Sequence, residues 1–321
     1  MHEVLNQIQE MGIVPVVKID DPAKAVPLAK ALKAGGLPCA EITFRTGAAK
    51  EAMEQINREM PEILMGAGTV LTTEQVDRAI ASGAKYIVSP GLNPNVVAYC
   101  VKKGIPIVPG CSNPSDMELA IEAGLEVVKF FPAEECGGLN YIKAVSAPFP
   151  MLKFIPTGGV NVENLNTYLS FDRILAIGGS WMVKADLINE GKFDEITRLT
   201  KEAISTMLGF RLAHFGFNTA TEDEALRTAG LWEKLFNFQV KPGSSSVFAD
   251  TWFEHMKSPY LGKYGHIAIG TLNVNRAMAY LKRQGYDFKS ETAKTNDKGE
   301  ITSIYLKDEI ADFAIHLVKV K

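Results

Sequence analysis

Lys129 is the only charged residue inside an apolar stretch, VVKFFP at residues 127–132. A free lysine is an ammonium ion at neutral pH, and burial in an apolar strand lowers its pKa because burial disfavours the charge. A neutral amine attacks a ketone to form an imine, and the protonated imine stabilises the enamine left when a C–C bond breaks. The alternative is a lysine at a strand end whose amine reaches solvent.

Glu41 is a second lone charge in an apolar stretch, CAEITF at residues 39–44. An imine mechanism needs several proton transfers, and a carboxylate near the amine carries them. An ion pair between Glu41 and Lys129 that only holds the fold together would have the same geometry. Both interpretations stay open, and the activity of a Glu41→Gln variant separates them.

Other residues near the ends of apolar stretches suit an anionic substrate. Arg45 offers a planar guanidinium for a carboxylate or phosphate, and the hydroxyls of Thr69 and Thr157 suit the carboxylate of a 2-oxo acid. The segments 158–159 and 178–180 are Gly-Gly and Gly-Gly-Ser, which either bind phosphate through backbone N–H groups or form tight turns. An imine lysine with carboxylate and phosphate sites indicates an aldolase for a phosphorylated 2-oxo sugar acid.

The element that must position these residues is a barrel. Eight short apolar stretches, rich in β-branched residues, alternate with helical patterns such as 22–36 and 73–83. The eight predicted strands are residues 13–19, 39–44, 63–70, 86–90, 105–110, 127–132, 154–159 and 174–180. This order predicts a (β/α)8 TIM barrel, in which the C-terminal ends of the strands converge on one site. A doubly wound open sheet competes, but no GxGxxG follows the first strand.

The pattern changes after residue 208, and four of the five histidines lie beyond this point. HFGFNT at 214–219 and HIAIGT at 266–271 are each followed by a helical pattern and then by short strands. Such a duplication predicts a small α+β domain of paired βαβββ units. The sequence therefore predicts a barrel domain at residues 1–208 and a second domain at residues 212–321.

Composition excludes several classes of protein. The chain has 321 residues, 46% of them hydrophobic, and a net charge of −3, which does not favour nucleic acid as a partner. No apolar stretch approaches the roughly 18 residues of a membrane helix. The four cysteines are widely spaced and predict reduced thiols, not a disulfide framework or a zinc site. We expect a cytoplasmic protein with a small-molecule substrate and without a nucleic-acid or membrane partner.

Residues 1–208 resemble the 2-keto-3-deoxy-6-phosphogluconate (KDPG) aldolases, which also act on 4-hydroxy-2-oxoglutarate. The resemblance lies in EITFRT (41–46), GAGTV (66–70), SPG (89–91), KFFPAE (129–134), PTGGV (156–160) and GGSW (178–181), in this order. It implies a homotrimer that needs no cofactor or barrel metal and acts in the Entner–Doudoroff pathway. The segment GCSNPSD at 110–116 departs from the family pattern, which leaves the choice of aldehyde open.

The resemblance also implies a role for each matching residue. Lys129 forms the Schiff base with pyruvate, and Glu41 is the acid/base. The substrate-binding residues are Arg45, Thr69, Pro90, Thr157, Gly158, Gly159, Gly179 and Ser180, of which the last four hold the phosphate.

Residues 212–321 resemble the vicinal oxygen chelate, or glyoxalase-like, fold. This resemblance implies four metal ligands, which are His214, Glu254, His266 and His316. A set of three imidazoles and one carboxylate suits a divalent transition metal. His316 departs from the usual final glutamate, and a metal-free accessory domain remains the alternative.

Three functions are compatible with the sequence. The leading hypothesis is a lyase that cleaves KDPG to pyruvate and glyceraldehyde 3-phosphate, with 4-hydroxy-2-oxoglutarate cleavage to pyruvate and glyoxylate as a second activity, or a related aldolase for another 2-oxo sugar acid. The second is a phosphate-binding barrel isomerase or synthase without an imine. The third is a non-catalytic protein in which only residues 212–321 bind a ligand.

Overall fold

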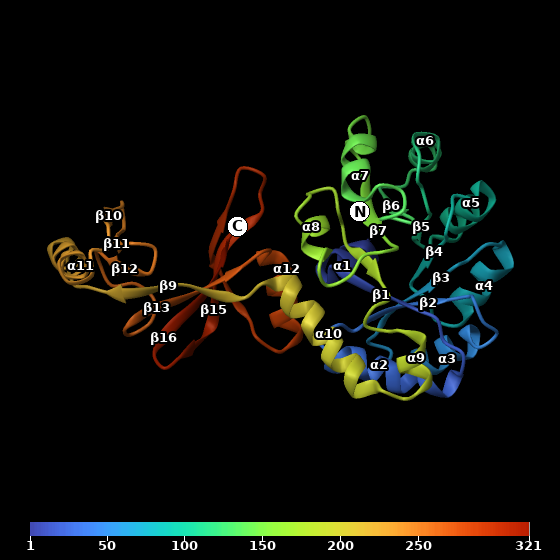
Figure 1. Ribbon diagram of the computed structural model, residues 1–321, viewed down its shortest axis with the longest axis horizontal. Helices are drawn as coiled ribbons and strands as arrows, with labels where there is room; N and C mark the ends of the chain where they lie inside the picture. Colours follow the sequence, from blue (N-terminus) through green and yellow to red (C-terminus); the bar gives the residue numbers. More distant parts are fainter. Residues whose placement is uncertain (321) are drawn as a thin grey trace. The chain divides into compact units, whose positions relative to one another are not determined.

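The chain forms two compact units, Met1–Met207 and Leu208–Lys321, each with its own sheet (Figure 1). The structure is a computed structural model that describes residues 1–320. No helix in that range is long and apolar enough to cross a membrane.

The first unit is a closed ring of eight parallel strands, as the sequence predicts. The strands are β1 (Ile13–Val17), β2 (Cys39–Thr43), β3 (Leu64–Gly68), β4 (Tyr86–Val88), β5 (Ile107–Val108), β6 (Val127–Phe130), β7 (Lys153–Pro156) and β8 (Ile177–Gly179). Six of them pair in the order β5-β4-β3-β2-β1-β8, and β6 pairs with β7. The bridges Gly110↔Lys129 and Thr157↔Gly178 join these two sheets and close the barrel.

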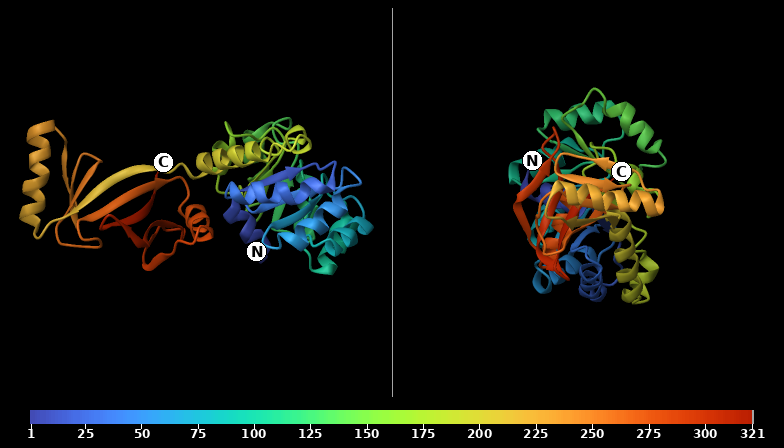
Figure 2. Two further views of the ribbon diagram at one scale, coloured as in Figure 1. Left: turned by 90° about the horizontal axis from the view of Figure 1, so that it is seen from below. Right: turned by 90° about the vertical axis from the view of Figure 1, so that its left-hand side faces the viewer.

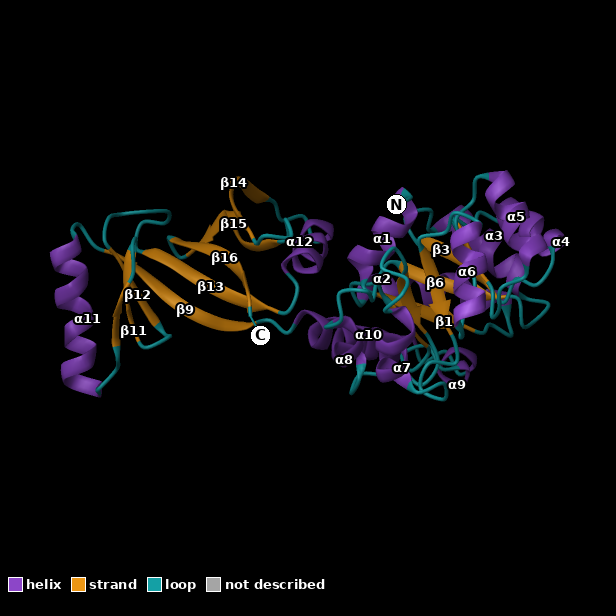
Figure 3. Cartoon of the chain, turned by 90° about the horizontal axis from the view of Figure 1, so that it is seen from above, coloured by secondary structure: helices purple, strands orange, loops and turns teal. Residues whose placement is uncertain are grey.

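Helices surround the strands on the outside of the ring (Figure 3). They are α1 (Glu3–Met11), η1 (Pro22–Lys24), α2 (Ala25–Ala34), α3 (Ala49–Glu59), α4 (Thr73–Ala81), α5 (Pro94–Lys103), α6 (Pro114–Glu122), α7 (Gly138–Ser146), α8 (Leu165–Leu169), α9 (Ala185–Asn189) and α10 (Phe193–Leu208). Helix α5 shows why they form where they do. The Asn93 side chain accepts from the Asn95 N–H, Pro94 occupies the first turn, and Gly104 ends the helix at φ 68°.

The second unit contains one eight-stranded sheet and two helices, built from two βαβββ units. The first βαβββ half of this second unit consists of β9 (Arg211–Asn218), α11 (Glu222–Phe236), β10 (Val240–Pro242), β11 (Ser246–Ala249) and β12 (Phe253–Met256). The second βαβββ half consists of β13 (Gly265–Thr271), α12 (Val274–Arg283), β14 (Phe288–Thr295), β15 (Ile301–Ile310) and β16 (Phe313–Lys319). The strand order is β10-β11-β12-β9-β13-β16-β15-β14, and the sheet is strongly twisted (Figure 2, yellow to red).

The two βαβββ halves are related by a local pseudo-two-fold axis. The central strands β9 and β13 are antiparallel, and His266 is opposite Gly216 just as Ala268 is opposite His214. On either side, β12 lies parallel to β9, and β16 lies parallel to β13. Equivalent residues of the first strands therefore lie near each other at the centre of the sheet.

Candidate active site

Lys129 and Glu41 meet inside the barrel. Strand β6 positions Lys129 and strand β2 positions Glu41, with 3.8 Å between Nζ and Oε1 and each side chain 5% exposed. This distance is too long for a hydrogen bond, and Glu41 Oε1 has no hydrogen-bond partner among the described residues. A solvent-reaching lysine does not fit this burial. The pair is instead an amine and a carboxylate held close together in an enclosed site.

The GAGT segment provides the space that Glu41 occupies. A Cβ added at Gly68 would lie 2.1 Å from Glu41 Oε1, and a Cβ at Gly66 would lie 2.2 Å from the Tyr86 ring. Strand β3 therefore carries glycines where side chains of its neighbours β2 and β4 need room. Two glycines within a strand are a recognisable sign of close approach, but only Thr69 was predicted to act in this segment.

Tyr86 on β4 is a residue that the sequence analysis missed. Its side chain is fully buried, and its hydroxyl lies 3.8 Å from Cys39 Sγ. Burial, with smaller contributions from Cys39 and Glu41, raises the pKa of Tyr86 well above its ordinary value. The barrel interior thus holds a neutral hydroxyl near the carboxylate of Glu41.

Arg45 and Thr69 are joined by a hydrogen bond in which Arg45 Nε donates to Thr69 Oγ1 at 3.3 Å. Thr69 adopts φ 56°, in the left-handed region that β-branched residues rarely occupy. Such a conformation costs on the order of 1 kcal/mol and is concentrated at functional sites in proteins. The structure therefore brings two of the predicted substrate-binding residues together, in a strained backbone conformation.

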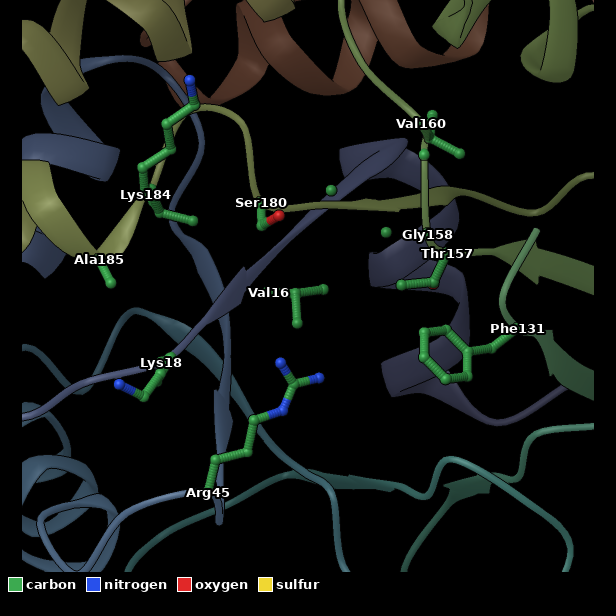
Figure 4. A pocket seen from close by; sticks show the side chains of 14 residues that line it. Val16, Lys18, Arg45, Phe131, Thr157, Gly158, Val160, Ser180, Lys184 and Ala185 are labelled. Carbon is green, nitrogen blue, oxygen red and sulfur yellow. The ribbon is translucent and has the colours of Figure 1, made fainter. Parts of the chain in front are cut away.

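A cavity of about 430 Å³ opens beside this pair, and six of the predicted residues line it: Arg45, Thr157, Gly158, Gly159, Gly179 and Ser180. Figure 4 shows the side chains of Arg45, Phe131 and Thr157 pointing into a common space. Phe131 lines the cavity and also lies beside the buried amine, because Lys129 Nζ is 5.1 Å from the centroid of its ring. One side chain therefore links Lys129 to the predicted substrate-binding residues of the cavity.

The glycines of this cavity cannot be replaced without strain. Gly158 and Gly159 have φ of 101° and 78°, which only glycine adopts readily. A Cβ at Gly178 would lie 2.3 Å from Thr157 Oγ1. A tight turn does not prevent glycine N–H groups from binding an anion, so the turn and phosphate interpretations are compatible with each other.

Lys18 and Lys184 also line the cavity, and the sequence analysis did not identify them. Lys18 pairs with Asp20 at 2.8 Å, whereas Lys184 has no ion-pair partner within residues 1–320. Each lysine follows a barrel strand, β1 or β8, on its C-terminal side. That position was the available sequence signal, because C-terminal strand ends face the site.

Pro90 lies outside the lining of this cavity. It is exposed and follows β4, where a Cβ at Gly110 would meet its carbonyl oxygen at 2.0 Å. Its role in substrate binding therefore remains a prediction from the family resemblance.

Comparison with known proteins places the barrel in a family. A family model described as KDPG and KHG aldolase matches residues 4–199. The chain belongs to this family. It is 45% identical over 204 residues to the 2-dehydro-3-deoxy-phosphogluconate aldolase of Treponema pallidum (strain Nichols), covering 64% of this chain and 97% of that protein. It is 42% identical over 192 residues to the KHG/KDPG aldolase of Escherichia coli (strain K12), covering 60% of this chain and 90% of the relative.

Solved structures of the aldolase family are similar as well. The KDPG aldolase of Legionella pneumophila, with pyruvate captured at low pH as a covalent carbinolamine intermediate, is 36% identical with a TM-score of 0.60. The match covers 62% of this chain and 97% of that structure. The aldolase of Zymomonas mobilis ZM4 with 3-phosphoglycerate is 40% identical with a TM-score of 0.58, and the match covers 62% of this chain and 94% of that structure.

A second cluster lies at the centre of the C-terminal sheet, where all four predicted metal ligands come together. His214 on β9 and His266 on β13 approach to 3.2 Å between their Nε2 atoms. Glu254 Oε2, on β12, lies 3.2 Å from His214 Nε2 and 3.0 Å from His266 Nε2. A Cβ at Gly216 would lie 2.0 Å from the His266 ring, so glycine on β9 is required for this approach.

His316 on β16 completes the cluster. The candidate ligand atoms of the three histidines lie within 4.8 Å of one another. Its Nδ1 lies 3.1 Å from Ser303 Oγ, and its buried Nε2 has no hydrogen-bond partner within residues 1–320. Burial, followed by the nearby His266 and His214, lowers the pKa of His316 to about 3. The ring is therefore neutral, which is the form that binds metal.

The carboxylate of Glu254 is ionised in the cluster. Burial alone would raise the pKa of Glu254, but hydrogen bonds with His214, His266 and Ser246 together hold it well below its ordinary value. Its other oxygen, Oε1, accepts a hydrogen bond from Ser246 Oγ at 2.6 Å, which fixes the orientation of the carboxylate.

These residues fit a divalent transition metal. Two ligand atoms that each lie about 2.0–2.1 Å from a metal are roughly 2.8–3.4 Å apart, depending on whether the geometry is octahedral or tetrahedral. The three separations among His214, His266 and Glu254 agree with that spacing. The neighbouring His255 does not join the cluster, because its ring stacks on Phe217 at 5.4 Å between centroids.

Proposed function

We propose that the barrel is a class I aldolase that cleaves KDPG to pyruvate and glyceraldehyde 3-phosphate. The observation that carries this proposal is the buried Lys129 amine, 3.8 Å from the Glu41 carboxylate, in a barrel of the KDPG/KHG aldolase family. A barrel isomerase that binds phosphate without an imine would leave this buried pair without a function. A non-catalytic scaffold would keep the pair only as a structural ion pair, but at 3.8 Å the two groups form no hydrogen bond that would hold the barrel together.

The proposed reaction begins when the Lys129 amine attacks the C2 ketone and forms a carbinolamine. Loss of water gives the protonated imine. Glu41 accepts the proton of the C4 hydroxyl, the C3–C4 bond breaks, and its electron pair moves into the imine to form an enamine. Glyceraldehyde 3-phosphate leaves, C3 of the enamine regains a proton, and hydrolysis of the imine returns pyruvate and the free amine.

Substrate orientation follows from the two ends of the site. Arg45, Thr69 and Thr157 are proposed to bind the carboxylate of the 2-oxo acid, because Arg45 contacts Thr69 and shares the cavity lining with Thr157, so their donors can converge on one anion. The backbone N–H groups at Gly158, Gly159 and Gly179 and the hydroxyl of Ser180 would hold the phosphate. This assignment explains why glycine turns on β7 and β8 line the same cavity as Arg45.

A second aldol substrate, 4-hydroxy-2-oxoglutarate, is supported by the name of the Escherichia coli relative and by Arg45. Arg45 lines the cavity and would bind the carboxylate next to the ketone, which both substrates carry. Cleavage would give pyruvate and glyoxylate by the same imine chemistry. The family resemblance also supports a homotrimer in the cytoplasm, and light scattering measures that assembly.

Borohydride trapping tests the imine directly. Incubation with pyruvate and borohydride should add one reduced pyruvate to Lys129, identified by peptide mass spectrometry. Lys129→Arg should remove the adduct, while Lys153→Arg, at the start of the neighbouring strand β7, should keep it. An adduct of equal yield in the Lys129→Arg variant would contradict the mechanism.

We further propose that the C-terminal unit holds a divalent transition metal through His214, Glu254, His266 and His316. The separations of 3.0–3.2 Å among the ligand atoms of His214, His266 and Glu254 support it, together with the resemblance to glyoxalase-like domains. Such a metal would supply Lewis acidity toward an oxygen ligand. Metal analysis of the purified chain should show about one ion per chain, lost in His266→Ala and kept in His255→Ala. Equal metal content in the two variants would rule this site out.

A further inference from the structure

A cavity of about 640 Å³ in the C-terminal unit opens onto the histidine cluster. It lies between the two βαβββ halves, with Phe248 and Met256 from the first half and Thr292 and Ser303 from the second among its walls. His214, Glu254, His266 and His316 all line it. Its size is within the range of cavities that bind small metabolites.

The charges around this cavity favour an anion. A divalent ion held by three imidazoles and one carboxylate would keep a net charge of about +1, because imidazole binds a metal without charge and only Glu254 would offset the ion. Three lysines also line the wall. Lys257 pairs with Glu222 at 2.6 Å and Lys319 with Glu300 at 3.2 Å, but Lys294 has no ion-pair partner within residues 1–320.

The rest of the wall suits a ligand rich in hydroxyl groups. Six hydroxyl side chains line the cavity: Ser244, Ser245, Ser258, Thr292, Thr302 and Ser303. Thr292 and Thr302 donate to the carbonyls of Lys289 and Lys294, and Ser303 pairs with His316 Nδ1. The hydroxyls of Ser244, Ser245 and Ser258 remain to donate and accept hydrogen bonds, which matches the alcohol groups of a sugar chain. The rings of Tyr260 and Tyr305, 5.8 Å apart between centroids and set edge to face, offer apolar surface for the C–H groups between those alcohols.

We propose that this cavity binds a sugar acid, with its carboxylate near the histidine cluster and Lys294 and its hydroxyl groups along the serine and threonine wall. This inference rests on the metal centre proposed above. It assigns the C-terminal unit a ligand of the same chemical class as the barrel substrate, a polyhydroxylated carboxylic acid. A neutral sugar lacks the charge that Lys294 and the metal require, and a simple carboxylate lacks the hydroxyls that the wall recognises.

The test uses gluconate, a six-carbon sugar acid without the ketone that Lys129 needs. The full chain is loaded with Co²⁺ and desalted, and gluconate, glucose and acetate are each titrated by calorimetry and by the Co²⁺ absorption spectrum. Gluconate should bind and shift the spectrum, and glucose and acetate should bind at least about tenfold more weakly. Lys294→Gln should weaken gluconate binding about tenfold or more, since a charge-assisted hydrogen bond is lost.

The matched control is Lys241→Gln, which removes the same charge from β10 outside the cavity lining. It should leave gluconate affinity unchanged. If Co²⁺ binds but gluconate causes no spectral shift, or if the two lysine variants bind gluconate equally well, the sugar-acid inference is wrong while the metal centre stands. If the chain takes up no metal, both proposals are wrong, and the aldolase proposal for the barrel is unaffected.

Discussion

Gly68 and Glu41 occupy adjacent strands of the barrel so closely that a Cβ on residue 68 would lie 2.1 Å from Oε1 of Glu41. The carboxylate therefore keeps its place, 3.8 Å from the Lys129 amine, because strand β3 has no side chain at this point. The absence of a methyl group at residue 68 is therefore a structural requirement for the position of the Glu41 carboxylate.

Gly68→Ala should push the Glu41 carboxylate away from Lys129 and lower kcat about tenfold or more, because small misplacements of catalytic groups carry large costs in rate. The change in KM should be small, since the residues that line the 430 Å³ cavity beside Arg45 are not displaced. Steady-state kinetics of pyruvate release measures both. Gly47→Ala is the matched control, because its Cβ would meet no described atom within 4 Å. Equal kinetics for the two variants would contradict a steric role for Gly68.

Glu41→Gln separates a proton carrier from a structural ion pair. The variant keeps the shape of the side chain but loses the base, so we expect kcat to fall about 10²–10⁴-fold. Borohydride should still trap pyruvate on Lys129, because the amine is retained. Each side chain of the pair is only 5% exposed. Near wild-type turnover with a lowered melting temperature would show instead that this buried pair only stabilises the fold.

The barrel was predictable because each strand is a short apolar stretch with a helix after it. The predicted strand at 105–110 contains only the two-residue strand β5, Ile107–Val108. Beyond it, Gly110 pairs with β6 only through an isolated bridge to Lys129, so it does not extend the strand. Periodicity alone does not show where a strand stops pairing, because pairing depends on the register of its neighbours.

The site was predictable where a residue type conflicted with its surroundings. Lys129 and Glu41 stood out as charges in apolar stretches, but Tyr86 did not, because a tyrosine in a strand looks like ordinary core. The distance between Lys129 and Glu41 was not predictable in this way, because it depends on the closure of the ring, which makes β2 and β6 face each other. In the second unit the four residues of the cluster were predicted from the resemblance to the glyoxalase-like fold, and a pseudo-two-fold axis brings the equivalent His214 and His266 together.

Ser180→Ala should separate phosphate binding from aldol chemistry. Ser180 lines the cavity beside Arg45, where the phosphate is proposed to bind. Loss of a hydrogen bond to a charged phosphate costs about 1.5–3 kcal/mol. The KM for KDPG should therefore rise roughly tenfold or more. With 4-hydroxy-2-oxoglutarate, which has no phosphate, kcat/KM should be unchanged. An equal loss with both substrates would place the phosphate elsewhere.

Cysteine reactivity should follow burial. Burial raises the pKa of Cys100 to about 12, and burial with a smaller contribution from Asp116 raises that of Cys111 to about 12 as well. At pH 8 both stay protonated, with thiolate on the order of one part in ten thousand. Cys39 is also buried, so a disulfide reagent should rapidly modify only the half-buried Cys136, and all four cysteines after denaturation. Cys136→Ser should abolish the rapid reaction, and two fast thiols in the folded chain would contradict this assignment.

Gly216→Ala tests whether the centre of the C-terminal sheet holds a metal. A Cβ at this position would lie 2.0 Å from the His266 ring, so the ring must move away from His214 and Glu254. Metal affinity, measured by competition with a chelator, should fall about tenfold or more, as it does when the support of a ligand is lost. Gly230→Ala in helix α11 is the matched control, because its Cβ would meet no described atom within 4 Å. Gly230→Ala should leave the metal affinity unchanged and stabilise the helix by about 0.5–1 kcal/mol. Equal metal affinities in the Gly216→Ala and Gly230→Ala variants would show that His266 is not a ligand.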